Sequence, residues 1–426
     1  MGPPSAAEAA DSLWRNRPFL RLWLAQALSQ TAGNAVNFGL IVMVERSSQS
    51  SLAMALAVLT VALPSVVLGV PAGALIDRGD ARRIVFAANA LRAVCVIGYP
   101  LFEDRLVMLL LTNLAFSVLT QFFAPAEAAL IPALVRRGRL VGANSLFQAT
   151  FVGSQAAGLA VLGPAMATIA GLDALFALVA ALFGAAAALT WRLPSVSAVR
   201  TAERLTWALL VADARRLAEY LRSDRIVAVA LPMWLAISVL LLVVAAVAPR
   251  YVVAVLALPV EASVALLAPA ALGGVLASGV LARMGDGIAP GGFAWRGMVG
   301  VGLCLFALGA IPRFGGSSGE SVLVLVLVLA LAGGVLATLV VVPSQAAVQG
   351  QVPADLRGRV FATQFALANA ASVLPLLGVG AAGDLLGPDV ALLLLGAVVM
   401  TLGFAAARSA FARGSAALAA GAGPHS

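Results

Sequence analysis

Uncharged polar side chains recur at helical spacing in two of the long hydrophobic stretches of the sequence. They are Gln30, Asn34 and Asn37 in the first stretch, and Asn113, Ser117 and Gln121 in the second. Steps of three or four residues place each set on one face of an α-helix. Amides and hydroxyls on such a face could bind a polar solute. Alternatively, they could hydrogen-bond between helices, which is worth about 0.6 kcal/mol per contact in membranes.

Two ionisable residues, Arg92 and Glu127, also lie inside hydrophobic stretches. A charge within a membrane is costly and commonly marks a functional site. We therefore predict Glu127 as a protonation site that couples proton movement to the activity of the protein, with Arg92 as the second coupling residue. The alternative is a structural ion pair, or a carboxylate in the inner headgroup region.

Five charges fall within seven residues between Asp77 and Arg83, in the segment that begins at Gly73. This segment connects two long apolar runs, so it must lie outside the hydrocarbon and marks one face of a membrane. A turn, a helix end and a carboxylate in one short connection are typical of a hinge or latch. The arginines could instead serve only to fix topology.

The composition of the 426-residue chain, 62% apolar and 11% charged, is typical of polytopic membrane proteins. Twelve apolar runs are long enough to cross the roughly 30 Å of hydrocarbon as helices. The predicted spans are residues 19–44, 52–76, 84–102, 106–130, 141–170, 173–193, 226–249, 261–283, 294–312, 321–349, 357–383 and 390–411. Continuous runs of this length exclude barrel strands, so we expect an all-α bundle.

The arginines are distributed unevenly between the two ends of these spans. With the N-terminus inside, 22 of the 27 arginines lie on one side and four on the other, while Arg92 stays within a span. Positive residues near span ends are retained in the cytoplasm, so both termini are predicted to be cytoplasmic. The net charge of +8 therefore reflects arginines that flank spans of the lipid bilayer on its cytoplasmic side. We expect no nucleic-acid partner.

The chain lacks the residues that several other kinds of chemistry need. It contains no lysine, so a phosphate-binding P-loop is excluded. The only histidine, His425, is next to last, and the two cysteines, Cys95 and Cys304, lie in apolar runs without metal-ligand spacing. We therefore expect no cofactor, no metal and no enzymatic activity.

The spans divide into two halves that repeat each other. The predicted parts are a tail 1–18, a first six-helix half 19–193, a central loop 194–225, a second half 226–411 and a tail 412–426. Residues 124–129, around Pro125, return as residues 342–347, around Pro343, at an offset of 218. Each half is expected to end its fourth span at this proline. Six-span parallel repeats are an architecture of transporters whose site lies near the midplane.

Together these features resemble the major facilitator superfamily over residues 15–411. The signature of that family, Gly-x-Leu-Ala-Asp-Arg-x-Gly-Arg-Arg, is matched by Gly73, Leu75, Asp77, Arg78, Arg82 and Arg83. Asp80, which replaces the second glycine, is similar to the exporter branch that holds macrolide-efflux and enterobactin-export type proteins. Further similarity to that branch lies in residues 19–26, 88–93, 125–132 and 352–361.

The chain also departs from the pattern of that family. Asn34 stands where the exporter branch usually has an aspartate. Gly163-Pro164 keeps the core of the antiporter signature in the fifth span, but the preceding glycine, Gly158, lies five residues back. The resemblance thus implies the fold and export, while these departures weaken the case for proton coupling.

The resemblance assigns roles to the residues singled out above. Spans one, four, seven and ten face the central cavity of the resembled fold, so the two polar sets are predicted to bind substrate. Trp234 in span seven is a further candidate, as a stacking surface for an aromatic cargo or as a packing residue. Asp77 is predicted to latch against Arg357 and Arg359 at the start of span eleven, which makes Gly73–Arg83 a candidate cytoplasmic gate.

We therefore predict a monomeric secondary transporter of the bacterial inner (cell) membrane that exports small amphipathic organic molecules, with protons as the expected coupling ion. An uncharged cavity would disfavour sugar phosphates and dicarboxylates. Uptake or lipid transport by the same architecture remains an alternative. A membrane enzyme would need clustered histidines, acids or metal ligands, which the chain lacks.

Overall fold

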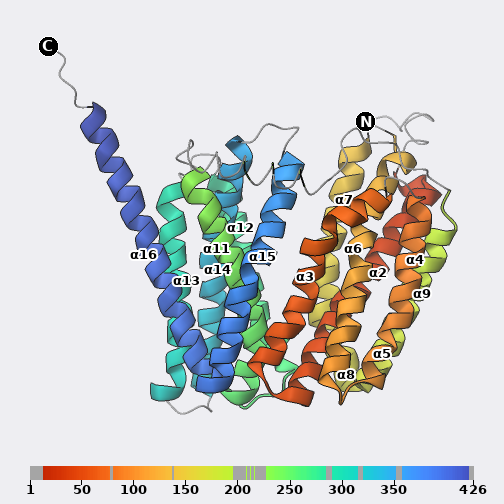
Figure 1. The fold of residues 1–426 in the computed structure, drawn as a ribbon, viewed down its shortest axis with the longest axis horizontal. Coiled ribbons are helices and arrows are strands. Elements are labelled where there is room, and N and C mark those ends of the chain that lie inside the picture. Colours follow the sequence, from red (N-terminus) through yellow and green to blue (C-terminus); the bar gives the residue numbers. More distant parts are fainter. Residues whose placement is uncertain are drawn as a thin grey trace, which may run out of the picture. The chain divides into compact units, whose positions relative to one another are not determined.

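The computed structural model describes residues 13–76, 80–136, 139–194, 227–284, 290–314, 320–351 and 357–421, together with Ala208, Ala212 and Arg215. These residues form helices and contain no strand (Figure 1). The chain divides into two compact units. The first comprises Met1–Ser48 and Leu59–Trp207, and the second comprises Gln49–Val58 and Ala208–Ser426.

The first unit contains the helices of the first half of the chain. They are η1 (Leu13–Arg15), α2 (Arg17–Ser48), most of α3 (Ser51–Ile76), α4 (Ala81–Val96), α5 (Gly98–Leu101), α6 (Leu106–Leu134), α7 (Leu140–Gln155), the π-helical η3 (Ala156–Leu162), α8 (Gly163–Ile169) and α9 (Gly171–Trp191). Asp80 caps α4 by accepting a hydrogen bond from the backbone N–H of Arg82 at 3.0 Å. Gly171, at φ +85°, makes the turn between α8 and α9 that only glycine adopts without strain.

The second unit contains six long helices and the first turns of α3. The six are α11 (Val227–Ala254), α12 (Ala262–Met284), α13 (Pro290–Phe314), α14 (Glu320–Gln351), α15 (Arg357–Leu386) and α16 (Pro388–Gly421). Asp384 accepts hydrogen bonds from Ser50 Oγ and Ser51 N, both at 2.6 Å, and from Leu52 N at 3.3 Å. The Asp384 carboxylate therefore caps and stabilises the N-terminus of α3.

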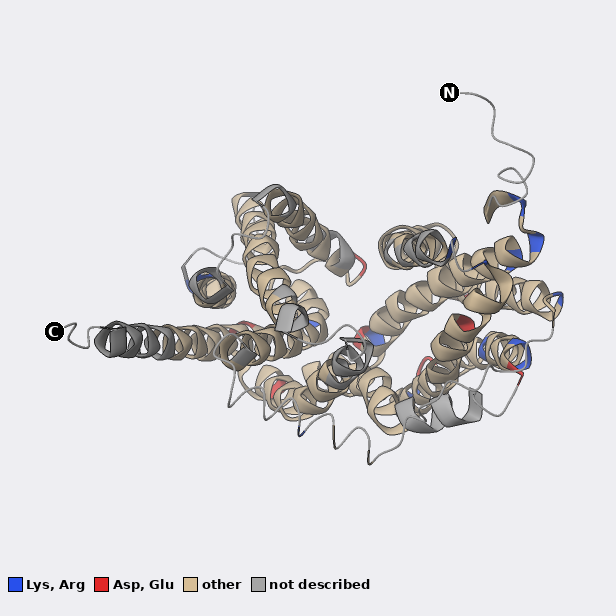
Figure 2. Cartoon of the chain, turned by 90° about the horizontal axis from the view of Figure 1, so that it is seen from above, with Lys and Arg blue, Asp and Glu red and all other residues tan. Residues whose placement is uncertain are grey.

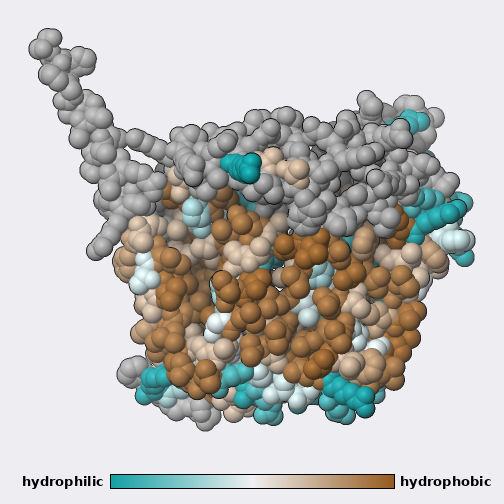
Figure 3. Space-filling model, in the orientation of Figure 1, coloured by the Kyte–Doolittle hydropathy of each residue, from teal (hydrophilic) through white to brown (hydrophobic). Residues whose placement is uncertain are grey.

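The helices have the length and composition of membrane spans. In the described residues, eleven are long and apolar enough to cross a membrane, and α12 carries a further apolar stretch, Leu267–Leu281. On the face drawn in Figure 3, described side chains are hydrophobic over the middle height of the helices and hydrophilic at the lower rim. The view in Figure 2 shows charges at only a few positions of otherwise uncharged helices. The protein is thus an all-α, multi-pass membrane protein.

The helix ends in the structure differ from the sequence predictions in two places. The fourth span of each half does not end at its proline, because α6 continues through Pro125 and Pro132, and α14 continues through Pro343. Membrane helices tolerate such prolines when neighbouring helices and side chains satisfy the freed backbone groups. α16 also runs past residue 411 to Gly421, since its end is rich in alanine, the best helix former. The predicted central loop, 194–225, lies almost entirely outside the described residues.

Each unit has a hydrophobic core of its own. In the first unit, Phe19 and Leu22 of α2 pack with Val85 of α4 and Phe123 and Leu130 of α6. In the second, a larger cluster joins side chains from α11, α13, α14 and α16. These cores fix the helices whose polar faces are described next.

Candidate functional site

A polar cavity of about 110 Å³ lies within the first unit, among α2, α3, α4 and α6. Its lining residues are Ser29, Gln30, Gly33, Asn34, Asn37, Val61, Arg92, Phe116, Ser117, Thr120 and Gln121. Most of these side chains end in an amide, a hydroxyl or a guanidinium. Such a cavity inside apolar helices can bind a solute that needs hydrogen bonds.

Five of the six residues in the predicted polar sets line this cavity, namely Gln30, Asn34, Asn37, Ser117 and Gln121. Asn34 Nδ2 donates to the Gln30 carbonyl oxygen at 2.8 Å. Gln121 Nε2 lies 3.5 Å from the Ser117 carbonyl oxygen. These bonds within single helices hold both amides against the cavity wall. Substrate binding by these residues remains a prediction.

Asn113, the sixth residue, does not line the cavity. It is fully buried, accepts a hydrogen bond from the Tyr99 hydroxyl at 2.7 Å and donates to Thr60 Oγ1 at 2.5 Å. The Tyr99 ring in turn stacks on Phe176 at a centroid distance of 5.0 Å. For Asn113 the structure therefore favours the alternative interpretation, an interhelical hydrogen bond.

Arg92 of α4 is almost fully buried, with 3% of its surface exposed, and it lines the cavity. Its Nε donates to the Ala88 carbonyl oxygen at 3.3 Å, and its Nη2 donates to Ser29 Oγ at 3.0 Å and Asn89 Oδ1 at 2.7 Å. Among the described residues, Arg92 brings a formal charge to a wall that is otherwise lined by uncharged side chains.

Two aromatic rings also hold the guanidinium. Arg92 Cζ lies 4.4 Å from the centroid of Phe123 and 4.8 Å from that of Phe183. A cation that is desolvated against aromatic faces gains roughly 2 kcal/mol or more. Neither ring is predicted from the sequence, and the same holds for Ser29 and Asn89. Only Asn89 offered a signal, three residues before Arg92 on the same helix.

Glu127 of α6 is likewise buried, with 6% of its surface exposed. It interacts electrostatically with Arg92 but does not line the cavity. Its Oε1 has no hydrogen-bond partner among the described residues. A buried, incompletely satisfied carboxylate beside a cation fits either a structural pair or a group that exchanges a proton.

The π-helix η3 packs closely against α2 next to the cavity. The amide of Gly163 donates to the Gly158 carbonyl oxygen, which is the i to i+5 bond of a π-helix. A Cβ at Gly158 would lie 2.3 Å from the Thr31 carbonyl oxygen, and one at Gly163 would lie 2.7 Å from the Phe38 ring. The five-residue spacing of the two glycines thus matches the π-helical turn and brings both to α2, whose Asn34 faces the cavity.

The candidate gate is described only in part. Asp77 and Arg78 lie outside the described residues, and only the backbone is described at Gly73, Arg357 and Arg359. Arg82 Nη1 donates to the Leu193 carbonyl oxygen at 3.1 Å, and Arg82 Cζ lies 5.4 Å from the Trp191 ring centroid. Arg82 therefore ties the start of α4 to the end of α9.

Arg83, the other described arginine of this segment, pairs with Asp80 at 3.6 Å and is largely exposed. Its contact is confined to the first turn of α4. A gating role for this segment remains a prediction.

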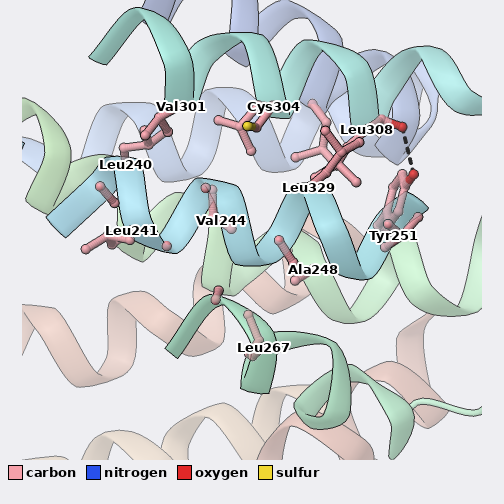
Figure 4. A pocket seen from close by; sticks show the side chains of 18 of the residues that line it. Leu240, Leu241, Val244, Ala248, Tyr251, Leu267, Val301, Cys304, Leu308 and Leu329 are labelled. Carbon is pink, nitrogen blue, oxygen red and sulfur yellow. Dashed lines mark hydrogen bonds between the residues drawn. The ribbon is translucent and has the colours of Figure 1, made fainter. Parts of the chain in front are cut away.

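A second cavity, of about 150 Å³, lies within the second unit and is apolar (Figure 4). α11, α12, α13 and α14 line it with side chains such as Leu240, Leu267, Cys304 and Leu329. Tyr251 also lines it, and its hydroxyl donates to the Leu308 carbonyl oxygen at 2.7 Å. Trp234 is buried on α11 and is not among the lining residues, so its predicted stacking role remains without support.

The described residues contain no cluster of three or more histidines, cysteines and acids that could hold a metal ion.

Residues 22–375 match the family profile of the Major Facilitator Superfamily, and the chain belongs to this family. It is thus a member of a family of membrane transporters.

The relatives and solved structures agree with this assignment. A segment of 144 residues is 30% identical to the uncharacterized MFS-type transporter YkuC of Bacillus subtilis (strain 168) and spans 33% of each chain. A crystal structure of a mutant of the nucleoside transporter NupG has a TM-score of 0.74 at 10% identity, covering 92% of this chain and 99% of that one. A POT family transporter in complex with 5-aminolevulinic acid has a TM-score of 0.70 at 12% identity, covering 91% and 95%. At these identities the structures show the fold alone.

Proposed function

We propose that this transporter exports small amphipathic organic molecules from the bacterial cytoplasm by alternating access, driven by proton antiport through Glu127. The observation that carries the proposal is the polar cavity of the first unit, with Arg92 in its wall and Glu127 behind it. A cavity with hydrogen-bonding groups and apolar surroundings suits a cargo of mixed polarity.

Two further observations support the direction and the location. The sequence resembles an exporter branch in several separate segments, and 22 of 27 arginines lie on the side that holds both termini. The inner (cell) membrane is therefore the proposed location, with both termini cytoplasmic. The nucleoside and peptide transporters of similar fold support transport as such and not a particular cargo.

Inverted membrane vesicles from an efflux-deficient bacterium would test both direction and coupling. Vesicles containing the protein should accumulate fluorescent amphipathic dyes when a proton gradient is imposed, beyond vesicles without it. Glu127→Gln should abolish gradient-driven accumulation, while passive exchange of preloaded dye continues. The matched control is Glu103→Gln, which changes an exposed carboxylate in the same unit and should leave accumulation unchanged.

Accumulation in right-side-out vesicles only would contradict export and establish uptake. Full gradient-driven accumulation by Glu127→Gln would remove Glu127 from the coupling step, whatever the direction of transport.

A further inference from the structure

Among the described residues, Arg92 carries the only formal charge on the wall of the polar cavity. The other lining groups are amides, hydroxyls and apolar side chains, and the cavity residues all lie in the described part of the chain. Glu127 offsets the guanidinium from a position that does not line the cavity. A bound solute therefore meets a cation and no anion.

The guanidinium also has donor capacity left for a ligand. Its hydrogen bonds within the described residues use Nε and Nη2, to Ala88, Ser29 and Asn89. A guanidinium has five N–H donors in a planar fork, so those of Nη1 remain for a solute. The fork geometry of arginine matches a carboxylate better than it matches a point-like acceptor.

We propose that this cavity recognises a carboxylate on a small amphipathic cargo, held by Arg92 and by the amides of Gln30 and Gln121. The inference rests on the proposed transport function and names the chemical class of its cargo. Charge-assisted hydrogen bonds formed in a desolvated site are about twice as strong as neutral ones. The same cavity would hold the corresponding neutral amide without that advantage.

Glu127 and the carboxylate of the cargo share one cation. Like charges near one site disfavour each other, so the charge on Glu127 opposes binding of the acid. Removal of that charge should strengthen acid binding, whereas removal of the charge on Arg92 should weaken it. A purely structural ion pair predicts a different result, since loss of either partner would then weaken the fold and binding together.

Acid–amide pairs of equal shape provide the test, with the full-length protein purified into lipid nanodiscs. The probes are benzoate and benzamide, naphthoate and naphthamide, and phenylbutyrate and phenylbutyramide, measured by equilibrium binding. For at least one pair, the acid should bind about tenfold or more tightly than its amide. The proposal is overturned when no acid binds more tightly than its amide.

Variants identify the residue responsible for this preference. Arg92→Gln should abolish it and Glu127→Gln should raise acid affinity, while Arg105→Gln, at an exposed arginine, should change neither. Persistence of the preference in Arg92→Gln would refute the assignment to Arg92.

Gly33→Leu tests whether the acid binds in this cavity, because it fills the cavity without changing the charge of any residue. Gly33 lines the cavity, and a Cβ there would meet no atom within 4 Å, so a leucine would fill the space without a clash at its base. It should reduce acid binding at least tenfold while the protein stays folded. Undiminished acid binding in this variant would place the acid elsewhere. Dye export without any acid preference would leave the transport function standing and reject only the carboxylate.

Discussion

Replacement of Gly158 by alanine tests whether close packing of η3 on α2 stabilises the first unit. The new Cβ would lie 2.3 Å from the Thr31 carbonyl oxygen, 2.7 Å from Asn34 Cβ and 3.1 Å from the Ala35 nitrogen. Two of these atoms belong to the backbone of α2 and cannot rotate away. The two helices must therefore move apart, which also displaces the cavity residue Asn34.

The size of the effect follows from two opposing contributions. Overpacking by one methyl group typically costs about 1–3 kcal/mol. Alanine recovers up to about 1 kcal/mol through its higher helix propensity relative to glycine. Gly158→Ala should therefore lower the free energy of unfolding by up to about 2 kcal/mol. Gly153→Ala, in the preceding helix α7, meets no atom within 4 Å and should be neutral or stabilising.

Unfolding in mixed micelles with increasing sodium dodecyl sulfate, followed by tryptophan fluorescence, would compare the two variants with the wild type. The difference between the variants isolates the overpacking contribution, because both gain the same helix propensity. Equal unfolding midpoints for Gly158→Ala and Gly153→Ala would refute the reasoning. The glycine would then be explained by something other than its approach to α2.

Two further substitutions test hydrogen bonds that the structure shows. Asp384→Asn removes the charged acceptor for the amides of Ser51 and Leu52 and should lower the free energy of unfolding by about 1 kcal/mol in the same assay; an unchanged midpoint would mean that water replaces the cap. Asn113→Leu breaks two interhelical hydrogen bonds, one of them to Tyr99, and should cost about 1 kcal/mol; a change of cargo preference without loss of stability would instead restore Asn113 as a substrate ligand.

The spans and the polar faces could be predicted because both depend on periodic patterns. Hydropathy identifies the helices, and the 3.6-residue period places Gln30, Asn34 and Asn37 on one face. The period does not tell which neighbour that face meets. For this reason the spacing predicts Asn113 on the same face as Ser117 but does not reveal its hydrogen bond with Tyr99.

The π-helix shows a different limit of sequence reasoning. Gly158 and Gly163 are five residues apart. In an α-helix this spacing would place them on different faces. The i to i+5 bond from Gly163 to Gly158 restores the common face. Apart from the spacing of its glycines, the sequence of Ala156–Leu162 does not indicate this bond. The glycine spacing is the one visible trace of it.

The offset of 218 relates some of the lining positions of the two cavities to each other. Applied to the structure, the offset of 218 pairs four lining positions of the first cavity with four of the second: Gln30 with Ala248, Gly33 with Tyr251, Asn34 with Val252, and Phe116 with Gly334. Arg92 pairs with Ala310 in the same comparison. At these positions the amides of Gln30 and Asn34 correspond to the apolar side chains of Ala248 and Val252. Recognition of a polar group is expected in the first unit, while an apolar cavity without a cation can select only by size and shape.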